Sequence, residues 1–435
     1  MRKSVALQRY LQRHIEPDLP DYRGTTPRWQ HALVIPAYRE SSALLQQLIA
    51  LPGATGSENT LVILVLNRPD SDGDKNANRA LRTAINTLPA DTGQPIVYRL
   101  NPYTELYVHD MDAAGVLHPG GQGVGLARKT GCDIALKWMT QGAINGPWIY
   151  CSDADAHLPA DYFSQLADAS PDAVAGVFPF THVPGQEHDC NAATALYELR
   201  LHHYVLGLEY AASPYAYHTL GSALAVKANA YAQVRGFPKR AGGEDFYLLN
   251  KLAKLGPVTR LAGHCIELQS RQSTRVPFGT GPAVAMISQG ERPQDSAVFY
   301  HPQCFSALRA VLSTMPNLQH KESAQLIKLL CELGLEQELA LACHQALHSL
   351  GLEEALNHCR TQGKAPNQFM RQFHQWFDAF RSLKFIHALR DDGWPQCSLA
   401  ELATLEPRLW QTDRATLWEV DSLRAISREY WGWQR

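Results

Sequence analysis

Short apolar runs that end in polar loops, with helical stretches between them, are the feature that most constrains this chain. Leu61–Leu66 is a continuous run of Val, Ile and Leu, which is typical of a parallel strand covered on both faces. His31–Glu40 begins as an apolar strand and ends in a loop, and residues 44–49 place Leu and Ile at helical spacing. Residues 75–88 also look helical, and Pro147–Cys151 forms a further short strand. This alternation predicts an α/β domain with a largely parallel sheet.

One more strand and one more helix are expected in this domain. Pro95–Leu100 is expected to be a third strand, and Gly121–Gly125 opens a helix. Three polar loops each follow an apolar strand: the Pro36–Glu40 loop, the loop that starts at Asn67, and the turn that contains Asp153. Ligands of open α/β sheets bind outside the carboxyl ends of the strands, so we expect these loops to converge on one edge of the sheet.

The turn after Pro147–Cys151 carries two carboxylates. Asp153 and Asp155 are separated by one residue, and Pro159 and Asp161 follow them. Mg²⁺ and Mn²⁺ prefer oxygen ligands, and one or two carboxylates with substrate phosphates often complete their coordination. The pair is therefore a candidate metal site. The alternative is that the aspartates only terminate a strand and cap a helix, which Asp often does.

Composition limits the class of protein. The chain has 435 residues, of which 45% are hydrophobic, and its 40 basic side chains nearly balance its 42 acidic ones. This balance gives no reason to expect a nucleic-acid partner. No apolar run is long enough to span a bilayer, and the polar N-terminus does not resemble a secretory signal. The nine cysteines form no C-x-x-C pair, so we expect reduced thiols and a cytoplasmic location; a peripheral membrane contact stays open.

Four motifs, in this order, resemble the family 2 glycosyltransferases of the GT-A fold, which is Rossmann-like. Val34–Glu40 is similar to the opening strand of that family, and Gly123–Gly131 is similar to its G-x-x-x-A-R-N-x-G helix. Ser152–Pro159 resembles its D-x-D segment, and Gly242–Asn250 resembles its E-D motif at a helix start. The resemblance extends over roughly residues 30–282. It implies an α/β GT-A domain.

The resemblance also implies a reaction and a set of residues. The enzyme would move a sugar from a nucleotide-diphosphate sugar donor to the hydroxyl of an acceptor that the sequence does not identify. Asp153 and Asp155 would hold Mn²⁺ or Mg²⁺ at the diphosphate, with Asp153 also in the donor site. Asn67 stands where the family commonly has Asp. The other residues that the resemblance places around the nucleotide sugar are Pro36, Ala37, Tyr38, Glu40, Arg128 and Lys129. For Arg128 and Lys129, a solvated helix face is the alternative.

Glu244 and Asp245 are the candidate catalytic residues. In inverting relatives, a carboxylate at this motif takes the proton of the acceptor hydroxyl, and we assign that role to Asp245. Glu244 is then expected to bind the acceptor or to lie near the metal, and the sequence does not decide between inversion and retention. The alternative is helix capping, because acidic residues are favourable at a helix N-terminus. The resemblance also makes His264 a candidate third metal ligand, and His157 and His218 compete for that role.

The segment Gln269–Gly281 is polar and carries Arg271 and Arg275. We expect it to fold over the donor diphosphate, because arginines pair well with phosphate oxygens. Processive members of the family carry a Q-x-x-R-W sequence near this position, and this segment has no tryptophan. We therefore expect a soluble, non-processive transferase.

The chain is expected to divide into a GT-A domain, residues 1–285, and a helical C-terminal domain, residues 286–435. The sequence Leu-Gly-Leu-Glu at Leu333–Glu336 recurs at Leu350–Glu353, which indicates two similar helical hairpins. An aromatic stripe at helical spacing starts at Phe369. It indicates a packed core, with acceptor binding as the alternative.

Two other classes of function stay open. A sugar nucleotidyltransferase shares the α/β fold and the metal, but such enzymes typically begin with a glycine-rich loop that Val34–Glu40 lacks. A non-catalytic nucleotide-sugar-binding protein need not keep Asp153, Asp155, Glu244 and Asp245 together, as this chain does. The glycosyltransferase is the function that the sequence favours.

Overall fold

The computed structural model of the chain describes residues 5–24, 27–51, 59–91, 93, 95–113, 115, 117–185, 188–271, 279–290, 292–405 and 418–435. The chain divides into two compact units. The first, here called the α/β unit, comprises Met1–Asn191, Thr219–Ala283 and Arg428–Arg435. The second, here called the helical unit, comprises Ala192–His218 and Val284–Ser427.

This division differs from the one expected from the sequence in two segments, each of which belongs to the other unit. The helical unit resumes at Val284, next to the expected boundary after residue 285. It also takes Ala192–His218 from within the expected first domain, while Arg428–Arg435 returns to the α/β unit. Composition along the chain does not show such exchanges, because they depend on which distant segments pack together.

An eight-stranded mixed sheet forms the centre of the α/β unit, with the strand order β10-β7-β9-β5-β1-β2-β4-β3. The pairs β1–β2, β2–β4, β1–β5 and β7–β10 are parallel, and β3, β9 run antiparallel to their neighbours. The predicted α/β fold with a mostly parallel sheet is confirmed. The strands are β1 (His31–Ala37), β2 (Thr60–Leu66), β3 (Tyr98–Arg99), β4 (Thr104–Asp110), β5 (Trp148–Cys151), β7 (Ala175–Val177), β9 (Leu224–Lys227) and β10 (Val258–Arg260).

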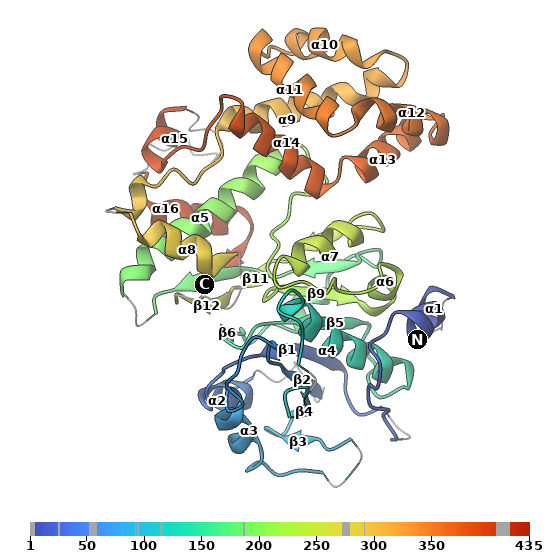
Figure 1. Cartoon of the computed structure of the whole chain (residues 1–435), viewed down its shortest axis with the longest axis vertical. Coiled ribbons are helices and arrows are strands. Elements are labelled where there is room, and N and C mark those ends of the chain that lie inside the picture. The colour runs from blue at the N-terminus through green and yellow to red at the C-terminus, as the bar shows by residue number, and fades with distance from the viewer. Residues whose placement is uncertain are drawn as a thin grey trace. The chain divides into compact units, whose positions relative to one another are not determined.

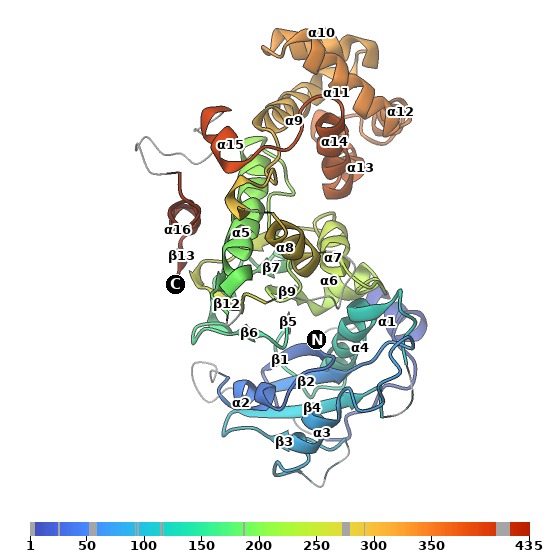
Figure 2. The same cartoon turned by 60° about the vertical axis from the view of Figure 1, so that its left-hand side comes forward.

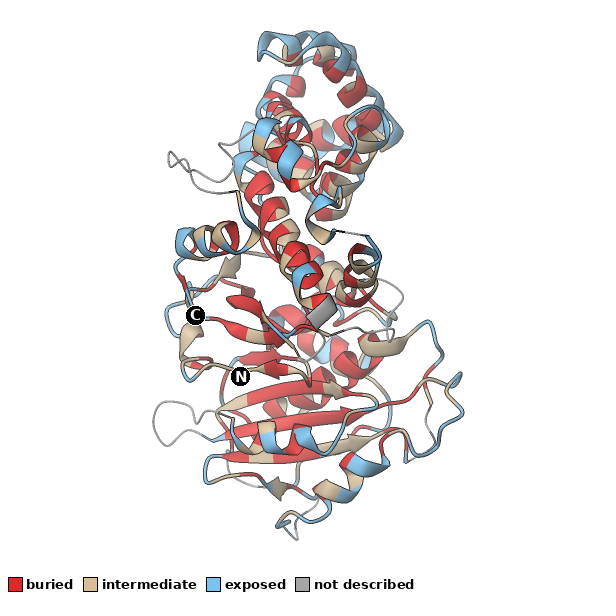
Figure 3. Cartoon of the chain, turned by 90° about the vertical axis from the view of Figure 1, so that its left-hand side faces the viewer, coloured by how far each residue is buried: buried red, intermediate tan, exposed pale blue. Residues whose placement is uncertain are grey.

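The middle of this sheet is covered on both faces. Every residue of β2 is buried, as its continuous apolar run predicts, and the central strands are red in the burial view of Figure 3. Figure 2 shows β1, β2 and β4 side by side. The helix α4 (Gly123–Thr140) packs against β1 and β2, and most of its residues are buried.

The third parallel strand differs from the expected one. Only Tyr98–Arg99 of the expected strand Pro95–Leu100 pairs, as an antiparallel edge strand, whereas β4 is the strand that joins β2. In β4, polar residues at both ends flank a run of only three apolar residues. One of the polar residues, Glu105, accepts hydrogen bonds from Arg28 Nε at 2.7 Å and from Trp29 Nε1 at 2.8 Å. Such polar residues interrupt the apolar pattern of β4, so the strand is hard to recognise from the sequence.

Two small sheets complete the α/β unit. The strands β6 (Ala156–His157), β12 (Ile266–Gln269) and β8 (Phe180–Val183) form one, in the order β6-β12-β8. In the other, β11 (Gly263–His264) pairs in parallel with the C-terminal strand β13 (Trp433–Gln434). The register of β12 with β6 matters for the site, because it brings the end of β12 back to the segment that follows β5.

Helices α9 to α14 belong to the helical unit and form the orange-to-red bundle labelled in Figure 1. Among the residues that the structure describes, no helix combines the length and the apolar character needed to cross a bilayer. The remaining helices of the chain are α1 (Val5–Arg13), α2 (Ala43–Ile49), α3 (Arg79–Ile85), α5 (His188–Tyr210), α6 (Ala228–Gln233), α7 (Glu244–Leu252), α8 (Thr280–Ser288), α15 (Leu399–Leu405) and α16 (Val420–Tyr430). The bundle comprises α9 (Pro302–Thr314), α10 (Leu326–Glu332), α11 (Gln337–Ser349), α12 (Leu352–Gln362), α13 (Pro366–Trp376) and α14 (Ala379–Asp391).

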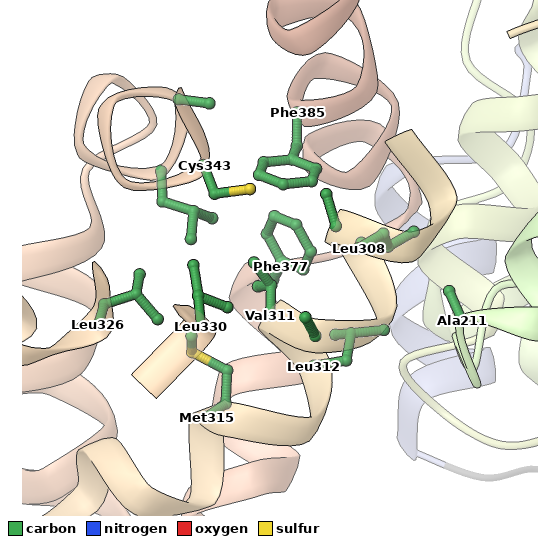
Figure 4. Close-up of a cluster of buried hydrophobic side chains, with 14 of the residues drawn as sticks. Ala211, Leu308, Val311, Leu312, Met315, Leu326, Leu330, Cys343, Phe377 and Phe385 are labelled. Carbon is green, nitrogen blue, oxygen red and sulfur yellow. The ribbon is translucent and has the colours of Figure 1, made fainter. Parts of the chain in front are cut away.

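The core of the helical unit confirms the interpretation of the aromatic stripe. Phe369, Phe373 and Phe377 are buried in one apolar cluster, and Figure 4 shows Phe377 and Phe385 facing the α9 side chains Leu308 and Val311. Each of the two Leu-Gly-Leu-Glu repeats joins two helices of this bundle. Their glycines, Gly334 and Gly351, have φ of 91° and 87°, a backbone conformation that favours glycine.

Candidate functional site

The parallel strands β1, β2 and β5 bring three polar loops to the same edge of the sheet. Ala37, at the end of β1, lies opposite Leu66, at the end of β2. On the other side of β1, Val34 pairs with Cys151, and the amide of Ser152 donates to the carbonyl oxygen of Val34 at 3.1 Å. The loops after all three strands therefore leave the sheet together, as the alternating sequence pattern predicted.

Arg128 connects the motifs of this site. Its guanidinium Nε donates to Glu244 Oε1 at 2.9 Å, Nη1 donates to the carbonyl oxygen of Ser152 at 3.2 Å, and Nη2 contacts Asp153 Oδ1. The side chain is buried, and a Cβ at Gly221 would come within 2.5 Å of Nη2. One buried cation thus holds the turn after β5 and the start of α7 together.

Glu244 and Asp245 occupy the first turn of α7, but their surroundings differ. Glu244 is buried and bound to Arg128. Burial raises the pKa of Glu244, and the charge of Arg128 opposes that rise. Asp245 Oδ1 instead accepts from the amide of Phe246 at 2.7 Å. Burial, and then the negative charge of Glu244, raise the pKa of Asp245 to about 7.

Asp155 lies near other carboxylates and is paired with the side chain of Arg271. Burial raises the pKa of its carboxyl group, and the charges of Asp153 and Glu40 raise it further, while Arg271 lowers it. Arg271 Nη2 lies 2.7 Å from Asp155 Oδ2. This contact follows from the β6–β12 register, which returns the chain after β12 to the turn after β5. Arg275, the second arginine predicted for this segment, lies outside the described residues.

Asp72 links the loops after β1 and β2, and neither Asp72 nor its partner Arg39 was predicted from the sequence as a site residue. Asp72 Oδ2 accepts from Tyr38 Oη at 2.6 Å, and Asp72 Oδ1 accepts from Arg39 Nη2 at 2.8 Å. Hydrogen bonds from Arg39 and then Tyr38 hold the pKa of Asp72 well below its usual range. Arg39 has a φ of 56°, which is uncommon for a residue other than glycine. The acidic run Asp70–Asp74 was the available signal for this network.

Asn67 is buried at the end of β2, and its environment differs from that of an exposed turn residue. Its Nδ2 lies 3.1 Å from His118 Nε2, and its carbonyl oxygen accepts from Asn78 Nδ2 at 3.1 Å. The adjacent Arg68 donates through Nε to Asp112 Oδ1 at 2.6 Å. Asn67 thus belongs to a hydrogen-bonded network at the base of the loop, whose members follow β2, precede α3 and follow β4.

Lys129 points into a different cluster from Arg128. Its ammonium group donates to Asp133 Oδ2 at 2.7 Å, to Tyr10 Oη at 2.8 Å and to the carbonyl oxygen of His14 at 2.8 Å. These bonds use the three N–H groups of the ammonium. We therefore leave Lys129 out of the proposed donor site and assign it to the contact of α4 with the N-terminal segment.

His264 lies on β11, where its Nδ1 is 3.1 Å from Asp161 Oδ2. The side chain is about half exposed. Within the described part of the chain, no group of three or more His, Cys, Asp or Glu side chains is arranged to hold a metal ion. Asp153 and Asp155 are brought together by the turn, whereas the structure pairs His264 with Asp161.

Comparisons with known proteins give structural matches only. No family model matches the chain, and no curated protein matches its sequence. The mannosyltransferase PcManGT from Pyrobaculum calidifontis in complex with GDP-Man and Mn²⁺ matches with a TM-score of 0.34 and 17% identity, over 89% of this chain and 92% of that chain. S. aureus TarS 1-349 in complex with UDP-GlcNAc matches with a TM-score of 0.33 and 12% identity, over 93% of this chain and 89% of that chain. Because the TM-scores and the sequence identities are low, the function of this protein is argued from the residues of the site.

Proposed function

We propose that this protein is a glycosyltransferase of the GT-A fold, similar to family 2 and non-processive. It would transfer a sugar from a nucleotide-diphosphate sugar donor to an acceptor hydroxyl. The observation that carries the proposal is the Arg128 bridge. It connects Asp153 with Glu244 and so joins the D-x-D segment to the helix start that carries Asp245.

Asp245 has the properties of a general base. A base works best when its pKa lies near the operating pH, and burial and Glu244 raise the pKa of Asp245 to about 7. In the proposed reaction, the acceptor oxygen forms a bond to the anomeric carbon, and the bond from that carbon to the diphosphate oxygen breaks. Asp245 takes the proton that the acceptor hydroxyl loses. Glu244, which Arg128 holds in place, would orient the acceptor.

Asp153 and Asp155 fit a hard divalent cation. Both present oxygen ligands, and the burial that raises the pKa of Asp155 shows that its charge needs compensation. In this structure Arg271 supplies that positive charge at 2.7 Å. When bound, Mn²⁺ or Mg²⁺ would neutralise the charge of the leaving diphosphate. His264 is the third ligand proposed from the sequence, and to bind the ion it must release Asp161.

The loops after β1 and β2 would bind the rest of the donor. Tyr38 and Glu40 lie at the edge from which the three loops leave, and Asn67 lies at the base of the second loop. Arg271, which is paired with Asp155 in this structure, and Arg275 would bind the phosphates of the donor. Pro36 and Ala37 are the last two residues of β1, and we propose that they contact the donor.

We also propose that the enzyme is cytoplasmic. All nine cysteines are described, and all of them are free. Free thiols are typical of reducing compartments, so we place the enzyme in the cytoplasm.

A donor screen with the full-length protein tests the proposal. UDP-, GDP- and CMP-sugars are added with Mn²⁺, and the melting temperature and the release of the nucleoside diphosphate or monophosphate are measured. A donor at about 100 times its Kd stabilises the folded state by about 2.7 kcal/mol. Binding without turnover against any acceptor would support the non-catalytic alternative. Release of pyrophosphate from a nucleoside triphosphate and a sugar phosphate would identify a nucleotidyltransferase.

A further inference from the structure

A cavity of about 380 Å³ lies in the α/β unit between α2 and the segment that follows β5. Cavities that hold small molecules in proteins have volumes of about 300–1,000 Å³, so this one is large enough for a ligand. Its described lining comes from three places in the chain: Ile35 on β1, residues 44–51 on and after α2, and Ser152–Leu158. None of these segments was assigned to acceptor binding above.

The walls of the cavity are mainly apolar. Leu44, Leu48 and Leu51 line one side, and Ala156 and Leu158 line the other. No Lys or Arg is among its described lining residues. A phosphate or another anion needs cationic partners or clusters of N–H donors. The one carboxylate of the described lining, Asp153, is already paired with Arg128, so the walls favour an uncharged apolar occupant.

One polar pair lies in the cavity wall. Gln47 Nε2 is 3.2 Å from His157 Nε2, and both side chains are partly buried. An amide and an imidazole of this kind can give one or two directed hydrogen bonds to a neutral ligand, for example to a hydroxyl or an ether oxygen. The pair would fix the orientation of an otherwise apolar group.

The cavity shares two lining residues with the candidate donor and catalytic site. Ser152 and Asp153 belong to its lining, and Arg128 binds the same two residues. We propose that the cavity binds an uncharged, apolar group of the acceptor, either aryl or alkyl, attached to the part that carries the reacting hydroxyl. This inference rests on the proposed function. It adds the chemical class of the acceptor, which neither the sequence nor the site chemistry had supplied.

Binding of an uncharged apolar fluorophore, N-phenyl-1-naphthylamine, tests the cavity without any need for turnover. The probe is titrated into full-length protein and into Leu48→Trp, which places an indole in the cavity. Ile49→Trp is the matched control, because Ile49 is the next residue of α2 and does not line the cavity. We expect saturable fluorescence enhancement that weakens about tenfold or more in Leu48→Trp and stays unchanged in Ile49→Trp.

A second filling variant keeps the test decisive if Leu48→Trp does not fold. Leu51→Trp lies on the same wall beyond the end of α2, at a half-buried position. Circular dichroism and the melting temperature establish which variants are folded. Equal probe affinity in wild type and in the folded filling variant would overturn the proposal. Competitive displacement of the probe by UDP or GDP would also overturn it, because the cavity would then belong to the donor.

Acceptor kinetics separate this inference from the proposed function. Methyl, phenyl and octyl glycosides of one sugar share the reacting hydroxyls and differ only in the attached group. We expect a lower KM for the phenyl or the octyl glycoside, and loss of that preference in the filling variant with the KM for the donor unchanged. Turnover with the same KM for all three glycosides would overturn the acceptor assignment and leave the transferase standing. Probe binding without turnover of any donor would instead refute the transferase, and the acceptor assignment with it.

Discussion

At the scale of single residues, the adjacent carboxylates of Glu244 and Asp245 differ in their binding partners and in the groups that shift their pKa. Glu244 is bound to Arg128 in a buried ion pair. Asp245 is bound to the amide of Phe246 and has a pKa of about 7. A buried anion that is paired with a cation is held in one position, whereas a carboxylate that exchanges its proton near neutral pH can serve as a base.

The first prediction concerns the base. Asp245→Asn keeps the shape of the side chain and the oxygen that accepts from Phe246, but it cannot take a proton at neutral pH. We expect kcat to fall by about 10²–10⁴-fold with the Kd of the donor unchanged. Asp172→Asn, at an exposed position, is the control and should retain full activity. A near-normal kcat for Asp245→Asn would exclude this residue as the base.

The second prediction concerns pH. Because the base must be deprotonated, kcat/KM should rise with pH and level off above about 7. The pKa of Asp245 is raised on folding from a usual value of about 4, so the folded state binds the proton more tightly than the unfolded state between about pH 4 and pH 7. The stability of the wild type should therefore fall as pH rises through this window, and less so in Asp245→Asn. Melting temperatures measured across this range, with the rate profile, check both signs.

The third prediction concerns the Arg128 bridge. Arg128→Met leaves Glu244 as a buried charge without its partner, so we expect a loss of about 3–5 kcal/mol in the free energy of unfolding, measured with urea. Adding Glu244→Gln removes that charge and should restore part of the loss. Arg390→Met, which breaks the exposed pair with Asp391, should cost about 1 kcal/mol or less. If the double variant is no more stable than Arg128→Met, the ion pair does not explain the loss.

At the scale of elements, the turn after β5 depends on strands that are distant in sequence. β1 fixes where the turn begins, through the pairing of Val34 with Cys151. β12 pairs with β6 and so brings Arg271 to Asp155. The arginine and a divalent cation would compete for the same carboxylate, so the proposed metal binding would be coupled to the position of Arg271.

The fourth prediction follows from that competition. Asp155→Asn should weaken Mn²⁺ binding, measured from the electron paramagnetic resonance signal of free Mn²⁺, and should abolish the metal stimulation of turnover. In the wild type, EDTA should remove turnover and added Mn²⁺ should restore it. Asp168→Asn, at an exposed position, should behave like the wild type. Undiminished turnover in EDTA would refute metal dependence.

At the scale of the whole molecule, the proposed site and the aromatic core belong to different units. The described residues of the proposed donor and catalytic site lie in the α/β unit. The helical unit has its own apolar core, built from α9 to α14 together with residues of α5 such as Leu208. A fragment of residues 1–285 would separate Leu208 from that core and would also lose β13, so the units are better tested within the full chain.

The fifth prediction uses this separation. Phe373→Ala removes a buried ring from α13 and should destabilise the helical unit by about 3–5 kcal/mol. We expect the Kd of the donor to stay unchanged, because no proposed donor-binding residue lies in that unit. The free energy comes from denaturant unfolding followed by circular dichroism, and the Kd comes from calorimetric titration. Leu405→Ala, at an exposed position, is the control. Loss of donor binding in a folded Phe373→Ala protein would show that the site needs the helical core.

The sequence by itself determined the features that depend on local patterns. The apolar run of β2, the helical spacing after β1 and the order of the motifs predicted the α/β fold and the edge where the loops meet. The aromatic spacing that starts at Phe369 predicted a packed core. These predictions are confirmed because apolar periodicity records burial directly. The expected third strand at Pro95–Leu100 is only the short edge strand Tyr98–Arg99, and β4, which pairs with β2, was not predicted because its polar residues interrupt the apolar pattern.

The tertiary structure alone decided which charged groups face one another. Arg128 and Lys129 are adjacent in sequence, yet one binds Glu244, 116 positions away, and the other binds Tyr10, 119 positions away. Their difference arises from the rotation between successive residues of a helix. The pairing of β13 with β11 and the return of Arg271 to Asp155 likewise depend on strand register. The contacts of Arg128 with Glu244 and of Arg271 with Asp155 join segments that are distant in the chain, so no local pattern of residues encodes them.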